Sequence, residues 1–513
     1  MSPETARADR QLPPVSGLLP RGLSARVFNP VTLIDAYKFD HRRQYPPGTT
    51  RVYSNLTPRS SRIEGIEDVV LFGLQAFLHR FMMDEMEAFF ASSEDEIADR
   101  YQRRIDGLLG PNDIGTDHIV ALHRLGYLPL RFCAVPEGTA VPLRVPMLTV
   151  ENTHPEFFWL VNYVETILLA SVWLPCTSAT QAVAMRRMLD AAARRTGGEE
   201  AFVDWQGHDF SFRGMGSLEA AAASGAGHLL AFAGTDTIPA LDYIDYYYPH
   251  HPDLLVGGSV PATEHSVMCA GGEETETETF DRLLHLYPSG IVSVVSDTWD
   301  LWHVLTEILP SLRDEIVARD GRLVIRPDSG DPVKVLCGDP EADERDPVRR
   351  GVAQLLWDHF GGTVNELGMK ILDPHVGVIY GDSINFARAV ALTEGLESIG
   401  FASTNVVLGI GSHTYQHVTR DTFGFAMKAT WASIDGAGRD LFKDPVTDSG
   451  VKRSAVGRLA VRPGDDGTLR LIERATAADE AESVLRPVWE DGKFVSESSF
   501  EQVLDRVGLR HLR

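Results

Sequence analysis

Four segments in the middle of the chain share one pattern. IVSVVSDTWD (291–300), LVIRPDSGD (323–331), VGVIYGDS (376–383) and NVVLGIGSH (405–413) each begin with a short, largely β-branched apolar run and end abruptly in Gly, Asp, Ser or Arg. Near-continuous apolar strands are typical of parallel sheets that helices cover on both faces. The pattern therefore predicts an α/β domain over roughly 180–415. We favour a barrel, although composition alone does not separate a barrel from a doubly wound sheet.

The polar end of the third segment indicates how strands and helices connect. Ser383 is a suitable N-cap, Ile384, Ala387 and Val390 begin an apolar stripe, and Gly400 suits the helix end. Helical spacing of apolar residues also covers 74–107 and 155–173, whereas 135–152 has the pattern of turns and short strands. Polar residues at the carboxyl ends of parallel strands predict a binding site at that mouth of the domain.

The N-terminal residues, the most apolar stretch and the cysteines indicate the cellular location of the protein. Residues 1–25 resemble a disordered, Pro-rich lead-in, and the apolar stretch 157–173 is interrupted by Asn162 and Glu165, which favours a buried helix over a membrane span. The four cysteines are far apart and form no CxxC pair, so the sequence suggests neither a zinc site nor a disulfide framework. We expect a cytoplasmic protein without a membrane partner.

The charge distribution limits the classes of ligand. The chain has 48 Lys and Arg against 72 Asp and Glu, a formal net charge of −24, which argues against nucleic acid as a partner. Such a protein also repels phosphorylated small molecules unless a basic region interrupts the acidic surface. Residues 420–458 are such a region, because they carry seven Lys or Arg against five Asp, a net +2, and leave −26 for the rest.

The strand ends supply the first candidates for chemistry. In RPDSG (326–330), Arg326 offers a fork of donors to phosphate, and Asp328 can accept hydrogen bonds from sugar hydroxyls or bind Mg²⁺; a turn with a surface ion pair is the alternative. Glycines at 381, 409 and 411 allow close backbone approach and leave N–H groups free for phosphate. Asp297 ends a fourth strand.

Three further motifs carry reactive or aromatic side chains. His265 in GGSVPATEHS (257–266) could accept a phosphoryl group or donate to a phosphate, or it could be a structural histidine. In HDFSFRG (208–214), Phe210 and Arg213 could provide a stacking surface and a polar handle for a flat ring. Asp236 in GTDT (234–237) could accept a hydrogen bond from an amide, or cap a helix.

Taken together, many long motifs resemble one family. They are DAYKFDHRRQYPPGTTRVYS, FGLQ, VPEG, TVENTHPEFFWLVNYVETILL, HDFSFRG, GTDT, SVPATEHS, VSVVSDTWD, IRPDSGDP, GDSIN, TRD and FKDPVTDSGVKRS. In this order, from about 31 to 500, they resemble the nicotinamide phosphoribosyltransferases of the type II phosphoribosyltransferase family. So many motifs in one order make chance similarity an inadequate explanation.

The resemblance implies an α/β fold with an irregular α/β barrel plus an α+β domain built from N-terminal and C-terminal segments. The implied division is a lead-in (1–25), an N-terminal domain (26–180), the barrel (181–415) and a C-terminal β-rich segment (416–513) that completes the N-terminal domain. The implied reaction in NAD salvage joins nicotinamide to 5-phosphoribosyl 1-pyrophosphate (PRPP), gives nicotinamide mononucleotide and pyrophosphate, and is coupled to ATP hydrolysis through a phosphohistidine. A homodimer with shared active sites is also implied.

The same resemblance implies roles for individual residues. Phe210 and the partner subunit's Tyr37 would stack on nicotinamide, and Arg213 and Asp236 would orient its carboxamide. The catalytic residues would be His265, Arg326 and Asp328, and His265 would be the histidine that ATP phosphorylates. Groups around the ring, ribose and 5′-phosphate would come from Ser259, Val260, Ala262, Ser293, Arg326, Pro327, Asp328, Gly381, Asp382, Gly411, Ser412 and Arg420. Pyrophosphate or ATP phosphates would contact Arg59, Arg213, His265, Arg326, Arg420, Lys428, Lys443 and Lys452, and Asp297 with Asp328 would bind Mg²⁺.

One departure and two alternatives remain at this point. The phosphate loop GIGSHTYQ has Ser412 and His413 where the family usually has glycines. The main alternative activity is that of a nicotinate phosphoribosyltransferase, but Asp236 would repel a carboxylate substrate by about 1–4 kcal/mol at short range. A non-catalytic homologue is the other alternative, and the retained Arg213, His265 and Arg326 argue against it.

Overall fold

The structure, a computed structural model, describes residues 28–443 and 454–511. The expected lead-in 1–25 and Lys452 lie outside this range. Six parallel strands form one sheet in the order β7-β6-β13-β12-β9-β8. They are β6 (Gly207–Asp209), β7 (Gly234–Thr235), β8 (Ser289–Val295), β9 (Asp320–Arg326), β12 (Val376–Tyr380) and β13 (Val406–Ile410). The last four are the strands predicted from the apolar segments, and that prediction is confirmed.

An irregular segment joins the two edges of this sheet. Gly258 pairs with Gly234 of β7, and Ala262 pairs with Ser293 of β8, both in the parallel sense. On the first side Gly258 N–H donates to Ala233 O at 2.8 Å, and on the second side Ser293 N–H donates to Pro261 O at 2.9 Å. Residues 258–263 therefore close the ring of strands, which makes the domain the irregular α/β barrel that was expected.

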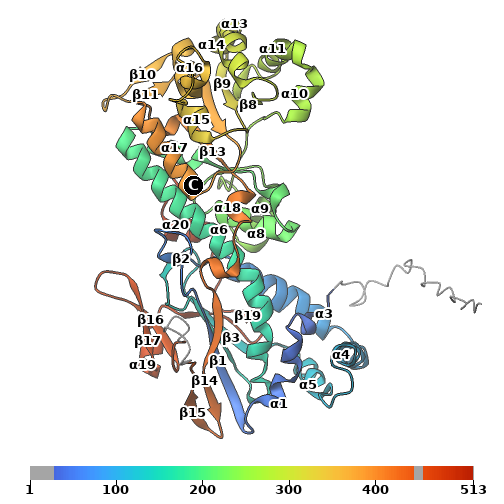
Figure 1. Cartoon of the computed structure of the whole chain (residues 1–513). Helices are drawn as coiled ribbons and strands as arrows, with labels where there is room; N and C mark the ends of the chain where they lie inside the picture. The colour runs from blue at the N-terminus through green and yellow to red at the C-terminus, as the bar shows by residue number, and fades with distance from the viewer. Residues whose placement is uncertain (1–27, 444–453, 512–513) are drawn as a thin grey trace, which may run out of the picture.

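Helices connect and cover the barrel strands (Figure 1). They are α7 (Val203–Gln206), α8 (Leu218–His228), α9 (Ile238–Tyr247), α10 (His265–Gly271), α11 (Glu276–Leu286), α12 (Leu301–His303), α13 (Leu309–Ser311), α14 (Arg313–Ala318), α15 (Pro332–Cys337), α16 (Gly351–Phe360), α17 (Phe386–Ser398) and α18 (Ser412–Tyr415). A small hairpin of β10 (Gly362–Val364) and β11 (Lys370–Leu372) lies beside α16.

The start of α17 corrects one prediction. Ser383 is not the N-cap, because Asn385 caps the helix by accepting a hydrogen bond from Arg388 N–H at 3.0 Å. Ser383 instead has a left-handed backbone, with φ of 56°, and its hydroxyl donates to Asp382 Oδ2 at 2.6 Å. The prediction that Gly400 marks the end of the helix is correct, since Gly400 follows the helix and has a φ of 80°.

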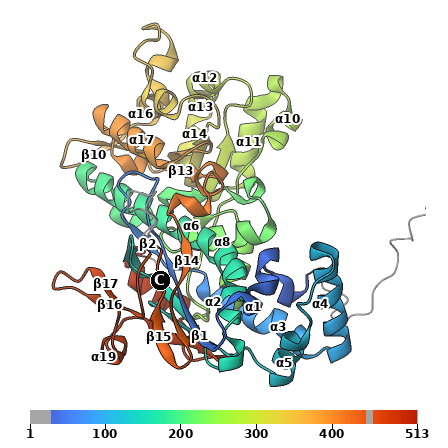
Figure 2. The same cartoon turned by 60° about the horizontal axis from the view of Figure 1, so that its bottom comes forward.

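A second, antiparallel sheet combines both ends of the chain. Its order is β15-β14-β1-β5-β3-β18-β19, in which β1 (Thr49–Thr57), β3 (Leu130–Ala134) and β5 (Leu148–Asn152) come from the N-terminal region. The other four are β14 (Ala426–Ile434), β15 (Ala437–Asp440), β18 (Arg486–Glu490) and β19 (Lys493–Phe494). Figure 2 shows β1, β14 and β15 side by side. This confirms the expected α+β domain built from N-terminal and C-terminal segments.

Shorter elements complete this domain. Its helices are α1 (His41–Gln44), α2 (Leu74–Phe77), α3 (Met86–Phe90), α4 (Glu94–Leu109), α5 (Asp117–Leu125) and α19 (Ala477–Ala481). Two ribbons pair β2 (Asp68–Val70) with β4 (Ala140–Pro142), and β16 (Leu459–Pro463) with β17 (Leu469–Glu473). The predicted helical stretch 74–107 thus contains helix α4 and, before it, a helical run from α2 to α3 that includes a π-helical part at Leu78–Glu85.

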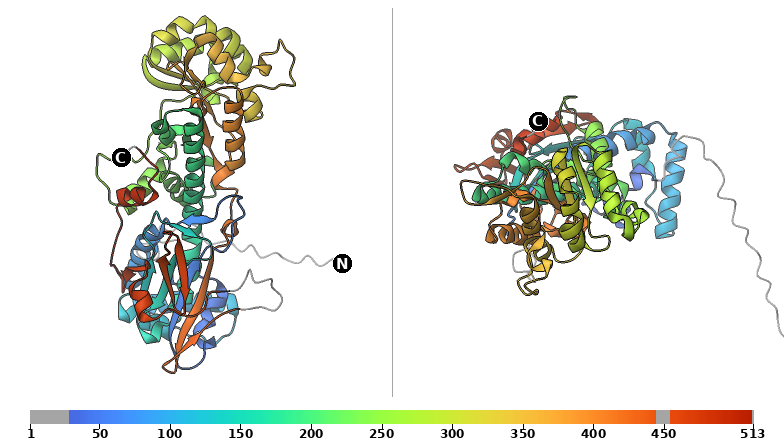
Figure 3. Two further views of the ribbon diagram at one scale, coloured as in Figure 1. Left: turned by 90° about the vertical axis from the view of Figure 1, so that its left-hand side faces the viewer. Right: turned by 90° about the horizontal axis from the view of Figure 1, so that it is seen from above.

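One long helix connects the two domains. Helix α6 (Leu160–Thr196) contributes Leu168 and Val172 to the core under the antiparallel sheet, and Met185 and Leu189 to the barrel core. Figure 3 shows it running from one domain into the other. It is the one helix in the described ranges long and apolar enough to cross a membrane, but 56% of its most apolar window is buried, as expected of a core helix.

The end of the chain returns to the barrel. Helix α20 (Phe500–Val507) places Phe500, Val503 and Leu504 in the barrel core. Beyond it, the buried Arg510 donates to the backbone carbonyls of Leu229, Leu255 and Val256 at 2.6–3.2 Å. Residues 500–510 therefore pack against the barrel.

Candidate active site

A cavity of about 650 Å³ lies along the inside of the barrel. Its walls include Phe210, Asp236, Ser259, Val260, Ala262 and Ser293, all of which were predicted site residues. It also reaches Gly290, Gly321 and His375, near the amino ends of β8, β9 and β12. The cavity therefore extends along the strands from the expected carboxyl-end site toward the opposite end of the barrel.

Phe210 forms an aromatic wall of this cavity. Its backbone N–H donates to Ile410 O at 2.9 Å, and its ring centroid lies 4.7 Å from that of His208. A Cβ on Gly409 would fall 2.8 Å from the Phe210 ring and 2.8 Å from Gly381 Cα. Gly409 is therefore the residue that lets β13 approach both the aromatic wall and the end of β12.

Asp236 provides a carboxylate beside this aromatic wall. Its Oδ1 accepts hydrogen bonds from His208 Nε2 at 3.0 Å and from the Ser259 hydroxyl. Burial opposes ionisation, but the hydrogen bond and charge of His208, with Ser259 and Arg326, hold the pKa of Asp236 below its usual value. Because 42% of its side chain is exposed, Asp236 is an ionised acceptor that a ligand can reach. It does not cap α9, whose N-cap is Thr237.

A second group of side chains gathers at the carboxyl ends of β8 and β9. Asp297 Oδ2 accepts hydrogen bonds from Asp328 N–H at 2.9 Å and from the Ser329 hydroxyl at 2.6 Å. Arg326 Nε lies 3.6 Å from Asp328 Oδ2, and His265 Nε2 lies 3.7 Å from Asp297 Oδ1. The structure thus brings together the predicted catalytic residues His265, Arg326 and Asp328.

The carboxylates of this group suit a divalent cation. Asp297 Oδ1 and Asp328 Oδ1 are buried and have no hydrogen-bond partner among the described residues. Burial raises the pKa of Asp328; the charges of Asp297 and Asp382 add to this, and those of Arg326 and His265 oppose it. Mg²⁺ prefers a few carboxylate oxygens completed by water and substrate phosphates. Since the described ranges hold no cluster of three or more such ligands, these two aspartates fit a cation that is shared with substrate.

The ends of β12 and β13 carry the predicted ribose and phosphate loops. Gly381 N–H donates to Pro327 O at 3.3 Å, which joins this loop to the RPDSG turn. Ser412 is the first residue of α18, and its hydroxyl packs so closely on Gly214 that a Cβ there would overlap it. Residue Arg213, next to Gly214, is therefore held beside the 411–412 loop.

Four of the predicted phosphate-binding cations line a separate pocket. Arg59, Arg420, Lys428 and Lys443 line a cavity of about 280 Å³, together with Glu165 and apolar residues of β14 and α6. Arg420 also makes an exposed ion pair with Asp421 at 2.8 Å. These four cations therefore line one cavity, and Lys452 lies outside the described residues.

One chain does not bring all the predicted residues together. Lys428 lies on β14 in the antiparallel sheet, whereas His265 begins α10 at the far end of the barrel domain (Figure 1). Tyr37 lies in the N-terminal turn Ala36–Asp40, is 64% exposed, and donates to Asp35 Oδ2 at 3.2 Å. The predicted site is therefore divided between two surfaces of the chain.

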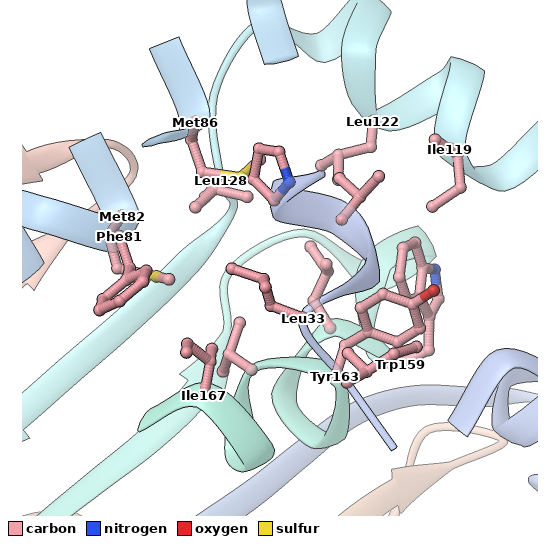
Figure 4. Close-up of a pocket in the computed structure, with 15 residues that line it drawn as sticks. Leu33, Phe81, Met82, Met86, Ile119, Leu122, Leu128, Trp159, Tyr163 and Ile167 are labelled. Carbon is pink, nitrogen blue, oxygen red and sulfur yellow. The ribbon is translucent and has the colours of Figure 1, made fainter. Parts of the chain in front are cut away.

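A smaller apolar cavity in the N-terminal domain is not a candidate. Its 30 Å³ is surrounded by side chains such as Leu33, Met86, Leu122 and Trp159 (Figure 4). Among the described residues no charged side chain lines it, and most of its walls belong to the core of that domain. It is a packing defect of the core and offers no groups for chemistry.

Sequence reasoning missed His208, which contacts both Phe210 and Asp236. A signal was present, because His208 is the first residue of HDFSFRG and lies two residues before Phe210, a spacing that places two side chains on the same side of an extended chain.

The barrel, together with the α+β domain built from N-terminal and C-terminal segments, defines the fold of type II phosphoribosyltransferases. Among solved structures, the nicotinate-nucleotide pyrophosphorylase of Pyrococcus furiosus has a TM-score of 0.55 at 14% identity, with 94% of this chain and 97% of that chain covered. Human nicotinic acid phosphoribosyltransferase has a TM-score of 0.53 at 17% identity, with 93% of each chain covered.

Sequence comparisons are more specific. Residues 205–493 match the nicotinate phosphoribosyltransferase (NAPRTase) family, and residues 29–131 match the nicotinamide phosphoribosyltransferase N-terminal domain. Nicotinamide phosphoribosyltransferase of Acinetobacter baylyi is 51% identical over 492 residues, which are 93% of this chain and 97% of that protein. The enzyme of the same name from Xanthomonas campestris pv. campestris is 37% identical over 91% of this chain and 96% of its own. The chain belongs to the nicotinamide phosphoribosyltransferase family.

Proposed function

We propose that this protein condenses nicotinamide with PRPP to give nicotinamide mononucleotide and pyrophosphate, in NAD salvage. The main observation behind the proposal is that the ionised carboxylate of Asp236 and the ring of Phe210 line the same barrel cavity. A carboxamide N–H can donate to Asp236 while the pyridine ring packs on Phe210. A nicotinate carboxylate would be repelled by about 1–4 kcal/mol at the same place, which disfavours the acid as substrate.

The proposed reaction needs no general base. The pyridine nitrogen attacks C1 of the ribose with its own lone pair as the bond from C1 to the pyrophosphate oxygen breaks, and the electrons of that bond leave with pyrophosphate. The protein then has to align the two reactants and neutralise the leaving group, and such effects account for large rate enhancements. We propose that Arg326, Asp328, Gly381 and Asp382 hold the ribose, and that Gly411, Ser412 and Arg420 hold the 5′-phosphate.

Mg²⁺ is proposed as the metal, held by Asp297 and Asp328. When bound, it would neutralise charge on the pyrophosphate group. The two buried oxygens that lack a hydrogen-bond partner support this assignment.

The pocket of Arg59, Lys428 and Lys443 is proposed to bind pyrophosphate or ATP phosphates. Because it lies on a different surface from His265 and Asp328, we propose that a second copy of the chain completes each site. The partner subunit's Tyr37 would then cover the face of nicotinamide opposite Phe210. We therefore propose that the protein is a cytoplasmic homodimer, and that its ligands are small molecules and not nucleic acid or membranes.

His265 is proposed to couple ATP hydrolysis to the reaction. A ring nitrogen would attack the γ-phosphorus of ATP, ADP would leave with the electrons of the broken P–O bond, and water would later release phosphate from the histidine. The contact of His265 with Asp297 supports the role, since a carboxylate can fix the orientation and tautomer of the ring. An acid-labile phosphohistidine after incubation with ATP, absent in His265→Ala, is expected; equal labelling of that variant would contradict the role.

The overall proposal is tested by a product assay with PRPP and either nicotinamide or nicotinic acid, with and without ATP. We expect nicotinamide mononucleotide to be the main product and ATP to increase its yield. Product from the acid alone would establish the alternative, a nicotinate phosphoribosyltransferase. Asp236→Asn is expected to reduce the preference for the amide, and an unchanged preference would show that Asp236 does not recognise the carboxamide.

A further inference from the structure

His208 contacts two parts of the proposed nicotinamide site. Its Nε2 lies 3.0 Å from Asp236 Oδ1, and its ring centroid lies 4.7 Å from that of Phe210, at an interplanar angle of 45°. The side chain is buried on β6 and lines the barrel cavity with these two partners. One side chain therefore touches both the aromatic wall and the carboxylate.

The strand pairing holds this imidazole in place. His208 is opposite Gly234 in the parallel pair of β6 and β7. A Cβ on Gly234 would lie 2.7 Å from His208 Nδ1, so the glycine makes the space that the ring occupies. With Phe210 close to the ring and Gly234 facing Nδ1, the Nε2 edge is directed at Asp236.

The hydrogen bonds of Asp236 are asymmetric. In the described part of the chain, the side-chain donors to Asp236, His208 Nε2 and the Ser259 hydroxyl, both bond to Oδ1. The second carboxylate oxygen, Oδ2, therefore remains as an acceptor for a ligand. A carboxylate anchored through one oxygen presents the other in a defined direction, whereas an unanchored one rotates about its χ angles.

We propose that His208 is a positioning residue for amide recognition: by donating from Nε2 to Asp236 Oδ1, it directs Oδ2 of Asp236 toward the carboxamide N–H of the substrate. This inference rests on the proposed function. His208 lies on β6 and is not among the residues assigned to the ribose and 5′-phosphate of PRPP, which lie at or beyond the carboxyl ends of β9, β12 and β13. Its loss therefore affects the binding of nicotinamide and leaves that of PRPP unchanged.

Two variants separate the donor from the packing of the ring. His208→Phe keeps an aromatic ring beside Phe210 and removes the donor, and His208→Gln retains an N–H near the position of Nε2. For His208→Phe we expect KM for nicotinamide to rise about tenfold, as for loss of a hydrogen bond to a charged group, with KM for PRPP within about twofold. The amide-to-acid ratio of kcat/KM is expected to fall by a similar factor. His208→Gln is expected to recover most of both losses.

Ser259→Ala provides an independent check, because it removes the other donor to Asp236 Oδ1. A smaller rise in nicotinamide KM is expected, again with PRPP unaffected. Thermal midpoints of all three variants within a few degrees of the wild type are expected and would exclude a general loss of folding.

Two results would overturn the role of His208. One is an unchanged nicotinamide KM and amide-to-acid ratio in His208→Phe; the other is an equal loss for both substrates in His208→Phe and His208→Gln, which would indicate packing alone. Failure of the proposed function is distinguishable, since the wild type itself would then form no nicotinamide mononucleotide, and the role of His208 would fail with it.

Discussion

Gly381 packs directly against the carboxylate of Asp328: a Cβ built on Gly381 would overlap Asp328 Oδ1. The glycine directly follows β12, and the aspartate follows β9, the neighbouring strand in the sheet. Asp328 Oδ1 is also one of the two buried oxygens that lack a hydrogen-bond partner in the described ranges. The absence of a side chain at 381 therefore determines where the proposed metal-binding oxygen can lie.

Gly381→Ala is expected to move the Asp328 carboxylate and so to reduce activity. The overlapping atom is the end of a side chain, so the carboxylate can turn away at an expected cost of about 1 kcal/mol in stability. We expect kcat/KM for PRPP to fall by about two orders of magnitude, as for a misplaced catalytic group, with thermal stability nearly unchanged. Steady-state kinetics and a thermal melt measure the two effects.

Gly107→Ala is the matched control. Gly107 lies in α4, and a Cβ there meets no atom of the described residues within 4 Å. Wild-type kinetics and equal or slightly higher stability are expected, because alanine favours helix more than glycine does. Full activity in Gly381→Ala would show that the position of Asp328 Oδ1 is unimportant.

The separation of Lys428 from Asp328 predicts complementation between inactive variants. Asp328→Asn and Lys428→Ala are each expected to lose most activity as homodimers. If each site takes Asp328 from one chain and Lys428 from its partner, a mixed dimer has one site with both changes and one intact site. Unfolding and refolding the two variants together in equal amounts should then restore about a quarter of wild-type activity.

The same mixture distinguishes the other arrangement. If both residues act in one chain, every site of the mixed dimer carries one change, and no activity returns. A mixture of Asp328→Asn with Arg326→Ala is the control, because both residues belong to the barrel of one chain and no recovery is expected.

The barrel strands could be predicted because burial on both faces requires near-continuous apolar runs, which are visible in the sequence. β8, β9, β12 and β13 contain short, largely β-branched apolar runs, and polar residues or glycines at or directly after their ends lead toward the site. The segment that closes the barrel has no such apolar run. Residues 258–263, GSVPAT, have a turn-like composition, and only their backbone pairing with β7 and β8 identifies them as part of the ring.

Local capping and long-range placement were harder to predict. Ser383 and Asn385 are both good caps two residues apart, and the hydrogen bond of Ser383 to Asp382 leaves Asn385 to begin α17. The types of residue at the site were predictable from motifs. The distance between Lys428 and His265 was not, because it depends on how two sheets are joined by α6, and no local pattern encodes that arrangement.

Arg510 anchors the C-terminus and predicts a stability effect far from the site. Burial lowers the pKa of Arg510 to about 10, and its guanidinium donates to the carbonyls of Leu229, Leu255 and Val256. Arg510→Ala leaves these carbonyls without that donor and is expected to destabilise the protein by about 3 kcal/mol. Thermal or denaturant unfolding measures this. Arg470→Ala, which removes an exposed ion pair with Asp466, is expected to change stability by less than about 0.5 kcal/mol and is the control.

Glu276 predicts a specific dependence of stability on pH. Its Oε1 is buried without a hydrogen-bond partner among the described residues, and burial raises its pKa from 4.5 to about 7; His303 opposes this, and Asp300 and Glu273 add to it. Between these pH values the folded state binds more protons than the unfolded state. The free energy of unfolding therefore falls as pH rises from 4.5 to 7 and stays lower above pH 7.

Glu276→Gln removes this titration and is expected to stabilise the protein relative to the wild type, increasingly as pH rises. After allowance for solvent screening, the gain between pH 5 and pH 8 is expected to be about 1 kcal/mol. Thermal midpoints of both proteins at pH 5, 6, 7 and 8 measure it. Glu278→Gln, on the exposed face of the same helix, controls for the loss of one negative charge and is expected to give an offset that does not vary with pH. An equally constant offset for Glu276→Gln would mean that Glu276 is ionised in the folded protein throughout this range.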